Sequence, residues 1–223
     1  MLKLSPVALA GALLFESVRN PITQAGLQFA EHVSEKVLGA RRLAETFPDF
    51  QVAPLANFPY NYYDILDPEI DLDSWTLTVE GEVERPGDYS LDQIKELPHI
   101  SQNTRHICIE GWDVIGNFGG TRISDFLNTV GASRSARFIE VRCADDYYTS
   151  IDMESARHPQ SVLCYEMYGK PLDAGHGAPL RLQMPIKLGY KQAKYLVTFR
   201  VSRVLPSRRG YWEDLGYGWY GGV

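Results

Sequence analysis

The chain has 223 residues, of which 44% are hydrophobic and 22% charged, which is an ordinary globular composition and enough length for one large domain or two small ones. The formal net charge is −6, so the basic footprint of a nucleic-acid-binding protein is missing and we expect no nucleic-acid partner. The three cysteines form no CxxC or Cys/His cluster, which argues against a zinc ribbon, haem c and an iron–sulfur cluster.

Residues 1–55 are predicted to form an N-terminal helical segment. The apolar run at residues 4–15 is too short to span a bilayer, which takes about 20 residues. Apolar positions between residues 24 and 46 recur with a helical period, and Pro48 ends the pattern. Two interpretations stay open: an ordinary N-terminal helix, or the remnant of an export signal or anchor whose upstream part is missing.

Residues 56–223 are predicted to form the main domain. Prolines keep residues 48–70 in a loop, and from residue 75 short strands and helices alternate irregularly. We expect helices at 123–130 and after Ser90, which forms a capping-box pattern with Gln93. We expect a turn at 85–88 and strands at 75–83, 104–109, 137–143, 147–151, 162–167, 179–184 and 195–204. Without a regular βαβ rhythm, the pattern favours an α+β fold, and an aromatic tail follows at 210–223.

Cys108 stands in a setting that suits a metal ligand. Arg105 and His106 precede it, and positive neighbours lower the pKa of a thiol and favour the thiolate, the form that binds metals. Two other interpretations remain. Cys108 could be a small core residue, since free cysteine is among the most buried residue types, or a nucleophile with His106 as its base.

Several segments occur in the same order as in the molybdopterin-binding catalytic domain of the sulfite oxidase family. The chain resembles this family over roughly residues 56–205, and within it the methionine sulfoxide reductase catalytic subunits most. The segments that carry the resemblance are Trp75-Thr76-Leu77, Cys108-Ile109-Glu110-Gly111-Trp112, His158-Pro159, Tyr168-Gly169-Lys170-Pro171-Leu172, Gly177-Ala178-Pro179-Leu180-Arg181-Leu182 and Leu188-Gly189-Tyr190-Lys191. The fold implied is a mixed-sheet α+β domain.

The resemblance implies a molybdenum–molybdopterin cofactor (Moco). Cys108 would bind the metal, Trp112 and Arg105 would face the substrate, and the remaining matched residues would contact the pterin or its phosphate. These cofactor-binding residues are Asn61, Tyr63, Asp64, Cys143, His176, Arg181, Lys191, Gln192 and Lys194. Three of them depart from the reductase pattern: Asp64 replaces a glutamate, Cys143 a threonine and His176 an asparagine.

The implied activity is two-electron oxygen-atom transfer that reduces a small S-oxide or N-oxide. Sulfite oxidation is the alternative, but it needs an arginine cluster, and only Arg105 and Arg122 lie near Cys108 in the sequence. A cofactor-free binding module that keeps the fold is a third interpretation. The resemblance further implies a separate electron-transfer partner, in the reductases a membrane haem protein, and a periplasmic location with or without membrane attachment, while a cytoplasmic location stays open.

Overall fold

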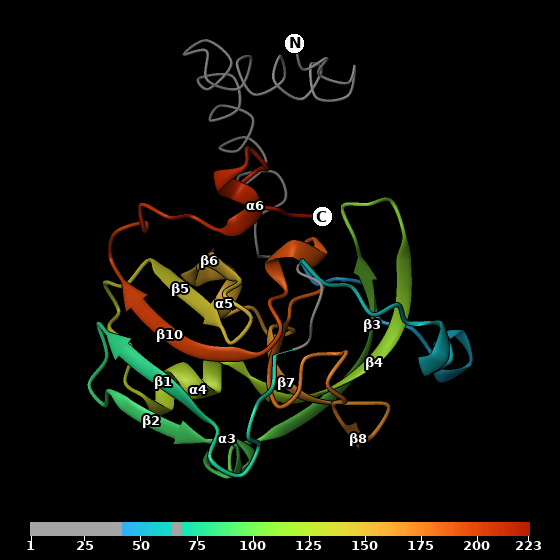
Figure 1. Cartoon of the computed structure of the whole chain (residues 1–223), viewed down its shortest axis with the longest axis horizontal. Coiled ribbons are helices and arrows are strands. Elements are labelled where there is room, and N and C mark those ends of the chain that lie inside the picture. Colours follow the sequence, from blue (N-terminus) through green and yellow to red (C-terminus); the bar gives the residue numbers. More distant parts are fainter. Residues whose placement is uncertain (1–41, 64–67) are drawn as a thin grey trace, which may run out of the picture.

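The computed structural model describes residues 42–63 and 68–223, and it contains two five-stranded sheets (Figure 1). The predicted N-terminal helix up to residue 41, and Asp64, lie outside the described residues. The first sheet has the order β2-β1-β10-β5-β6. Its strands are β1 (Thr76–Gly81), β2 (Gly87–Ser90), β5 (Phe138–Cys143), β6 (Tyr148–Asp152) and β10 (Leu196–Ser202). β1 runs parallel to β10 and the other neighbours are antiparallel, so this sheet is mixed.

The second sheet has the order β3-β4-β7-β8, with β9 also paired to β7, and all its pairs are antiparallel. Its strands are β3 (His99–Ile107), β4 (Asp113–Arg122), β7 (Val162–Met167), β8 (Lys170–Pro171) and β9 (Arg181–Gln183). β3 and β4 form the long curved hairpin on the right of Figure 1. The α+β class with a mixed sheet is therefore confirmed.

The helices are short. They are α3 (Leu91–Lys95), α4 (Ile123–Thr129), α5 (Met153–Ala156), α6 (Tyr211–Asp214) and the 3-10 helices η1 (Asp49–Gln51), η2 (Leu55–Asn57) and η3 (Gly189–Lys191). Of these, α3, α4 and α5 directly follow strands, whereas the others lie in loops. Ser90 and Gln93 form the predicted capping box at α3. In the described ranges no helix is long and apolar enough to cross a bilayer.

The main core lies under the first sheet and follows from the periodicity of its elements. α4 buries Ile123, Phe126 and Leu127, which lie on one helix face, and they pack in one cluster with alternate residues of β1 such as Leu77 and Val79. A smaller cluster around Phe58 and Phe118 lies against the second sheet. The two clusters hold the sheets in place beside the cavity described below.

Two parts of the chain differ from the sequence prediction. Residues 42–53 form no α-helix: Thr46 forms a bridge with Thr104, and the amide of Ala53 donates to the carbonyl of Ile115, so this stretch packs on β3 and β4. The ten-residue strand β4 was not predicted because it contains three glycines. A Cβ at one of them, Gly120, would lie 2.1 Å from the carbonyl oxygen of Leu163, so glycine is required for β7 to approach.

Candidate active site

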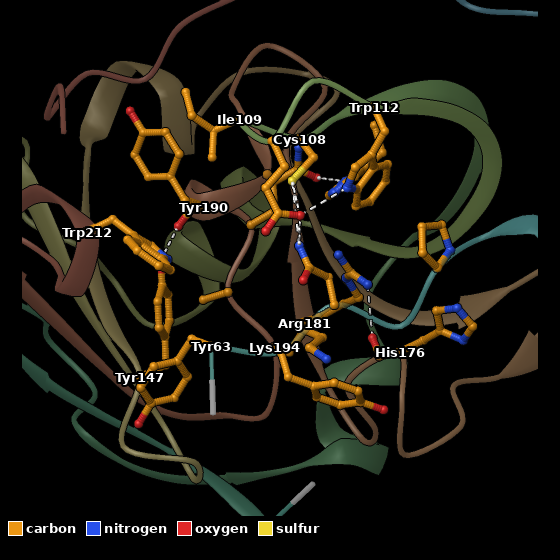
Figure 2. A pocket seen from close by; sticks show the side chains of 18 of the residues that line it. Tyr63, Cys108, Ile109, Trp112, Tyr147, His176, Arg181, Tyr190, Lys194 and Trp212 are labelled. Atoms are coloured by element: carbon orange, nitrogen blue, oxygen red, sulfur yellow. Dashed lines mark hydrogen bonds between the residues drawn. The ribbon is translucent and has the colours of Figure 1, made fainter. Parts of the chain in front are cut away.

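A cavity opens where loops of both sheets meet, and Cys108 lies in its wall (Figure 2). Its lining comes from separate stretches of the chain: the loop before β1, the end of β3, the β5–β6 turn, the region from Gly175 to Lys194, and the C-terminal tail. The polar lining residues include Asn61, Glu110, Asp145, His106, His176, Arg181, Gln192 and Lys194. The aromatic ones include Phe58, Tyr62, Tyr63, Trp112, Tyr147, Tyr190, Trp212 and Tyr217.

A tight turn after β3 places Cys108, Glu110 and Trp112 together. The amide of Cys108 donates to the carbonyl of Trp112 (2.9 Å), and Gly111 takes a φ of +92°, which suits glycine. The Glu110 carboxylate accepts hydrogen bonds from Trp112 Nε1 (3.1 Å) and Asn61 Nδ2 (3.4 Å). Asn61 Nδ2 also lies 3.5 Å from the Cys108 sulfur. The Glu110 carboxylate therefore links Trp112 of the turn to Asn61, which lies beside the thiol.

The predicted lowering of the Cys108 pKa is wrong. Burial raises the pKa of this thiol, and the negative charge of Glu110 adds to the increase. His106 supplies no positive charge, because burial and the charge of Arg181 lower its pKa to about 3. Arg105 points to the other face of β3, where it pairs with Asp113 at 3.2 Å and packs on the ring of Phe47. In this environment the neutral thiol is favoured over the thiolate.

Cationic and donor groups gather on another side of the cavity. Arg181 of β9 is only 3% exposed, and its Nη1 donates to the carbonyl of His176 at 3.0 Å. Its Nε is buried and finds no hydrogen-bond acceptor among the described residues. Lys194 Nζ donates to the carbonyl of Gly175 (2.9 Å) and lies 4.1 Å from the centre of the Tyr62 ring. A buried guanidinium with an unused donor beside an ammonium is a suitable place for an anionic group.

Histidine and glutamine side chains in this region are held by hydrogen bonds. The ring of His176 lies 2.9 Å from Asp173 Oδ1 through its Nδ1 and 3.4 Å from the carbonyl of Phe58 through its Nε2. Gln192 Oε1 lies 3.2 Å from Nδ1 of His106, and Gln192 Nε2 donates to the carbonyl of Lys187 at 2.8 Å. These hydrogen bonds fix the orientation of His176, Gln192 and His106.

Most of the sequence-predicted residues meet in this cavity, but three do not. Those that line it are Asn61, Tyr63, Cys108, Trp112, His176, Arg181, Gln192 and Lys194. Arg105 points away, as described above. Cys143 ends β5 inside the main core, where burial raises its pKa well above the ordinary value. Lys191 is buried with its amine against the Glu213 carboxylate and the Ser150 carbonyl.

Sequence reasoning also missed residues that line the cavity. Glu110 lies inside the segment that identified Cys108, but nothing in the residue pattern gave its carboxylate a role. Trp212 and Tyr217 belong to the aromatic tail, whose composition suggested a packed or covering segment without saying which rings face a site. Only the tertiary fold brings the tail to the Cys108 turn.

Comparison with known proteins gives a consistent result. Residues 65–212 match the family model "Oxidoreductase molybdopterin binding domain". "Putative protein-methionine-sulfoxide reductase subunit YedZ1" of Azospira oryzae is 41% identical over 209 residues, which cover 93% of this chain and 78% of that protein. "Protein-methionine-sulfoxide reductase catalytic subunit MsrP" of Xanthomonas axonopodis pv. citri is 30% identical over 168 residues, 68% of this chain. The matched region is 52% of that relative, so the chain spans about half its length.

Among solved structures, the sulfane dehydrogenase SoxCD of Paracoccus pantotrophus shares the fold with a TM-score of 0.59. The match covers 64% of this chain and 42% of that one, at 18% identity. The fold, the cavity around Cys108 and the family match agree, and the chain belongs to the molybdopterin-binding oxidoreductase family.

Proposed function

We propose that this protein reduces a neutral sulfoxide by two-electron oxygen-atom transfer at a molybdenum–molybdopterin cofactor, with Cys108 as the protein ligand to the metal. The observation that carries the proposal is a single thiol in a cavity whose described residues include no group of three or more His, Cys, Asp or Glu able to hold a metal. Zinc would need three or four such ligands. Molybdenum in this cofactor brings two dithiolene sulfurs, so one thiolate from the protein is enough.

The described residues fit the cofactor chemically. The thiol of Cys108 lines the cavity and would lose its proton on binding the metal. Arg181, with its buried Nε, and Lys194 would hold the anionic phosphate of the pterin. His176 and Gln192, fixed by their own hydrogen bonds, would contact the polar edges of the ring system. The contacts of Lys191 and Cys143 described above give them no such role.

A neutral substrate is favoured by the charges around the thiol. Trp112, Asn61 and the Glu110 carboxylate surround the sulfur, and Arg105 faces the opposite side of β3. A sulfite dianion would meet a carboxylate instead of an arginine cluster. A sulfoxide needs only a donor for its oxygen and apolar surface for its substituents, and the relatives named above are methionine sulfoxide reductases.

In the proposed reaction a sulfoxide takes up two electrons and two protons and yields a sulfide and water. The bound cofactor supplies the two-electron redox chemistry. In the protein, Asn61 Nδ2 lies 3.5 Å from the Cys108 sulfur, so Asn61 would contact the cofactor close to the metal. Glu110 fixes the orientation of Asn61 and Trp112 by accepting a hydrogen bond from each. The residues thus bind and orient the substrate beside the metal.

We further propose that this protein is located in the periplasm and that its electrons come from a separate protein, a membrane haem protein. The support is the family resemblance together with the word "subunit" in the names of both relatives. Cell fractionation followed by co-purification tests both statements. Recovery of the mature protein in the cytoplasm, without a haem partner, would contradict them.

The proposed function is tested by elemental analysis for molybdenum, by pterin fluorescence after oxidative release, and by turnover assays with an artificial electron donor. We expect about one molybdenum and one pterin per chain, reduction of methyl sulfoxides, and no oxidation of sulfite. Sulfite oxidation would establish the alternative reaction. Absence of molybdenum and pterin, from a host that makes the cofactor, would establish a binding module.

A further inference from the structure

The cavity has a cationic side and an aromatic side. In Figure 2, Arg181, His176 and Lys194 lie on one side of Cys108 and Trp212 lies on the other, with Tyr147 and Tyr190 near it. An anionic cofactor would occupy the cationic side by charge complementarity. The aromatic side is then left for the organic part of the substrate.

Trp212 and Tyr217, from the C-terminal tail, form a single structural unit on the aromatic side. Their ring centres are 5.4 Å apart, and the amide of Tyr217 donates to the carbonyl of Trp212 at 3.1 Å. Tyr217 also packs on Tyr190 of η3, with ring centres 6.0 Å apart. The hydroxyl of Tyr190 donates to the carbonyl of Gly218 at 2.6 Å, which ties η3 to the tail just after Tyr217.

Two buried lysines anchor the tail to the body of the protein. The Lys191 amine donates to the Glu213 carboxylate, directly after Trp212. The Lys187 amine donates to the carbonyl of Tyr220 at 2.7 Å. Both lysines are 1% exposed, so the tail is held by buried charged groups on either side of Tyr217. Rings held in this way lose little conformational entropy when they contact a ligand.

Tyr217 lies at the mouth of the cavity. Tyr217 is 40% exposed, and Ile109, which also lines the cavity, is 45% exposed. Cys108, between the two sides, is only 7% exposed. A molecule that reaches the metal ligand from solvent therefore passes these apolar groups. Tyr217 also lies beyond residue 212, where the family match ends.

We propose that Trp212 and Tyr217 are specificity-determining residues that bind the apolar substituent next to the sulfur–oxygen bond of the substrate. This proposal rests on the proposed function. Sulfoxides with an aromatic substituent are then preferred over dimethyl sulfoxide, because the larger group buries more apolar surface and contacts the two rings.

The test compares methyl p-tolyl sulfoxide with dimethyl sulfoxide as substrates of the holoenzyme and its variants. In Trp212→Ala and Tyr217→Ala, the ratio of kcat/KM for the aromatic over the small sulfoxide falls about tenfold, mainly through KM, since one lost aromatic contact with its buried area has this effect. Leu215→Ala is the matched control, because Leu215 lies on the same tail, is exposed, and does not line the cavity. It keeps the wild-type ratio.

A second measurement separates this proposal from the proposed function. Calorimetric titration with methyl p-tolyl sulfone, which cannot donate its oxygen as a sulfoxide does, reports binding without turnover. If the enzyme reduces no sulfoxide but binds the sulfone, and this binding depends on Trp212, the proposed function is rejected. The proposal that Trp212 and Tyr217 bind the apolar substituent is then retained. An unchanged ratio of kcat/KM in both alanine variants would contradict a role of Trp212 and Tyr217 in substrate specificity. Loss of molybdenum and pterin from Trp212→Ala would also contradict it, because the indole ring would then contact the cofactor.

Discussion

Lys187 and Asp152 form a buried ion pair that joins the segment before η3 to the start of α5. The amine lies 3.2 Å from Asp152 Oδ2, and the other carboxylate oxygen accepts a hydrogen bond from the amide of Ser155 at 2.6 Å as the helix N-cap. Burial alone would raise the pKa of Asp152. The charge of Lys187 and the Ser155 hydrogen bonds outweigh burial and hold this pKa below its ordinary value. Asp152 therefore links stability to pH.

Asp152→Asn should lower the free energy of unfolding at neutral pH and make it less dependent on pH in the acid range. A lowered pKa means that the pair stabilises the folded state above the unfolded pKa of about 3.9, and that this stabilisation disappears as the pH falls through the folded value. Asparagine keeps the N-cap but removes the negative charge beside the buried Lys187 amine, at a cost of about 3–5 kcal/mol. Denaturant unfolding at pH 7 and pH 3 measures the effect.

The matched control for Asp152→Asn is Glu80→Gln. Glu80 pairs with Arg200 at 2.7 Å on the surface, where both side chains are exposed, so its loss should cost less than about 1 kcal/mol. An equal loss of stability at pH 7 and pH 3 in Asp152→Asn would contradict the linkage.

Lys191 should be needed for stability and not for retention of the cofactor. Lys191→Met leaves the Glu213 carboxylate buried without its cation and should cost about 3–5 kcal/mol in the free energy of unfolding. The double variant Lys191→Met/Glu213→Leu should recover part of this loss and keep a wild-type pterin content. If the double variant folds but retains no pterin, Lys191 is a cofactor-binding residue after all.

Cys108→Ser should fold and lose activity. Changes to groups that merely support a metal ligand lower activity by about 10- to 100-fold, so loss of the ligand itself should exceed a hundredfold. Turnover, molybdenum content and thermal unfolding are measured together. Cys164→Ala is the control, because Cys164 is buried on β7 outside the cavity and should remain active. Wild-type turnover in Cys108→Ser would exclude this residue as the ligand.

Arg181→Met should have opposite effects on the empty and the loaded protein. A well-packed apolar side chain avoids the desolvation cost of the buried guanidinium, so cofactor-free protein should be at least as stable as the wild type. The pterin content of protein made with the cofactor should fall sharply, because the phosphate loses its bidentate partner. Arg105→Met, an exposed arginine outside the cavity, should keep its pterin. Equal pterin in the two variants would reject Arg181 as the phosphate ligand.

The fold class could be predicted because local patterns determine most of the elements. The strand at 162–167 and the capping box at Ser90 follow from residues next to one another. β4 could not be predicted, since the glycines that weaken its strand pattern are there to let β7 approach. This requirement is visible only once both strands are paired.

For the site, the sequence could predict which types of side chain take part and in which order they occur along the chain, but not where they lie in space. Cys108 and Arg181 stand out by their chemistry and by the resemblance of their segments. The orientation of Arg105 depends on the register of β3, and the position of Lys191 depends on Glu213 in a tail that follows after β10. The pKa of Cys108 is determined by burial, which sequence neighbours do not report.

The pairing of β1 with β10 has a consequence for when the cofactor can enter. β1, the first strand of the mixed sheet, pairs with β10, the last strand in the sequence. Trp212 and Tyr217, which follow β10, supply part of the cavity lining. On the ribosome, a nascent chain that ends before these residues has neither the sheet nor the wall. The complete cofactor site can therefore form only after this whole region has been synthesised.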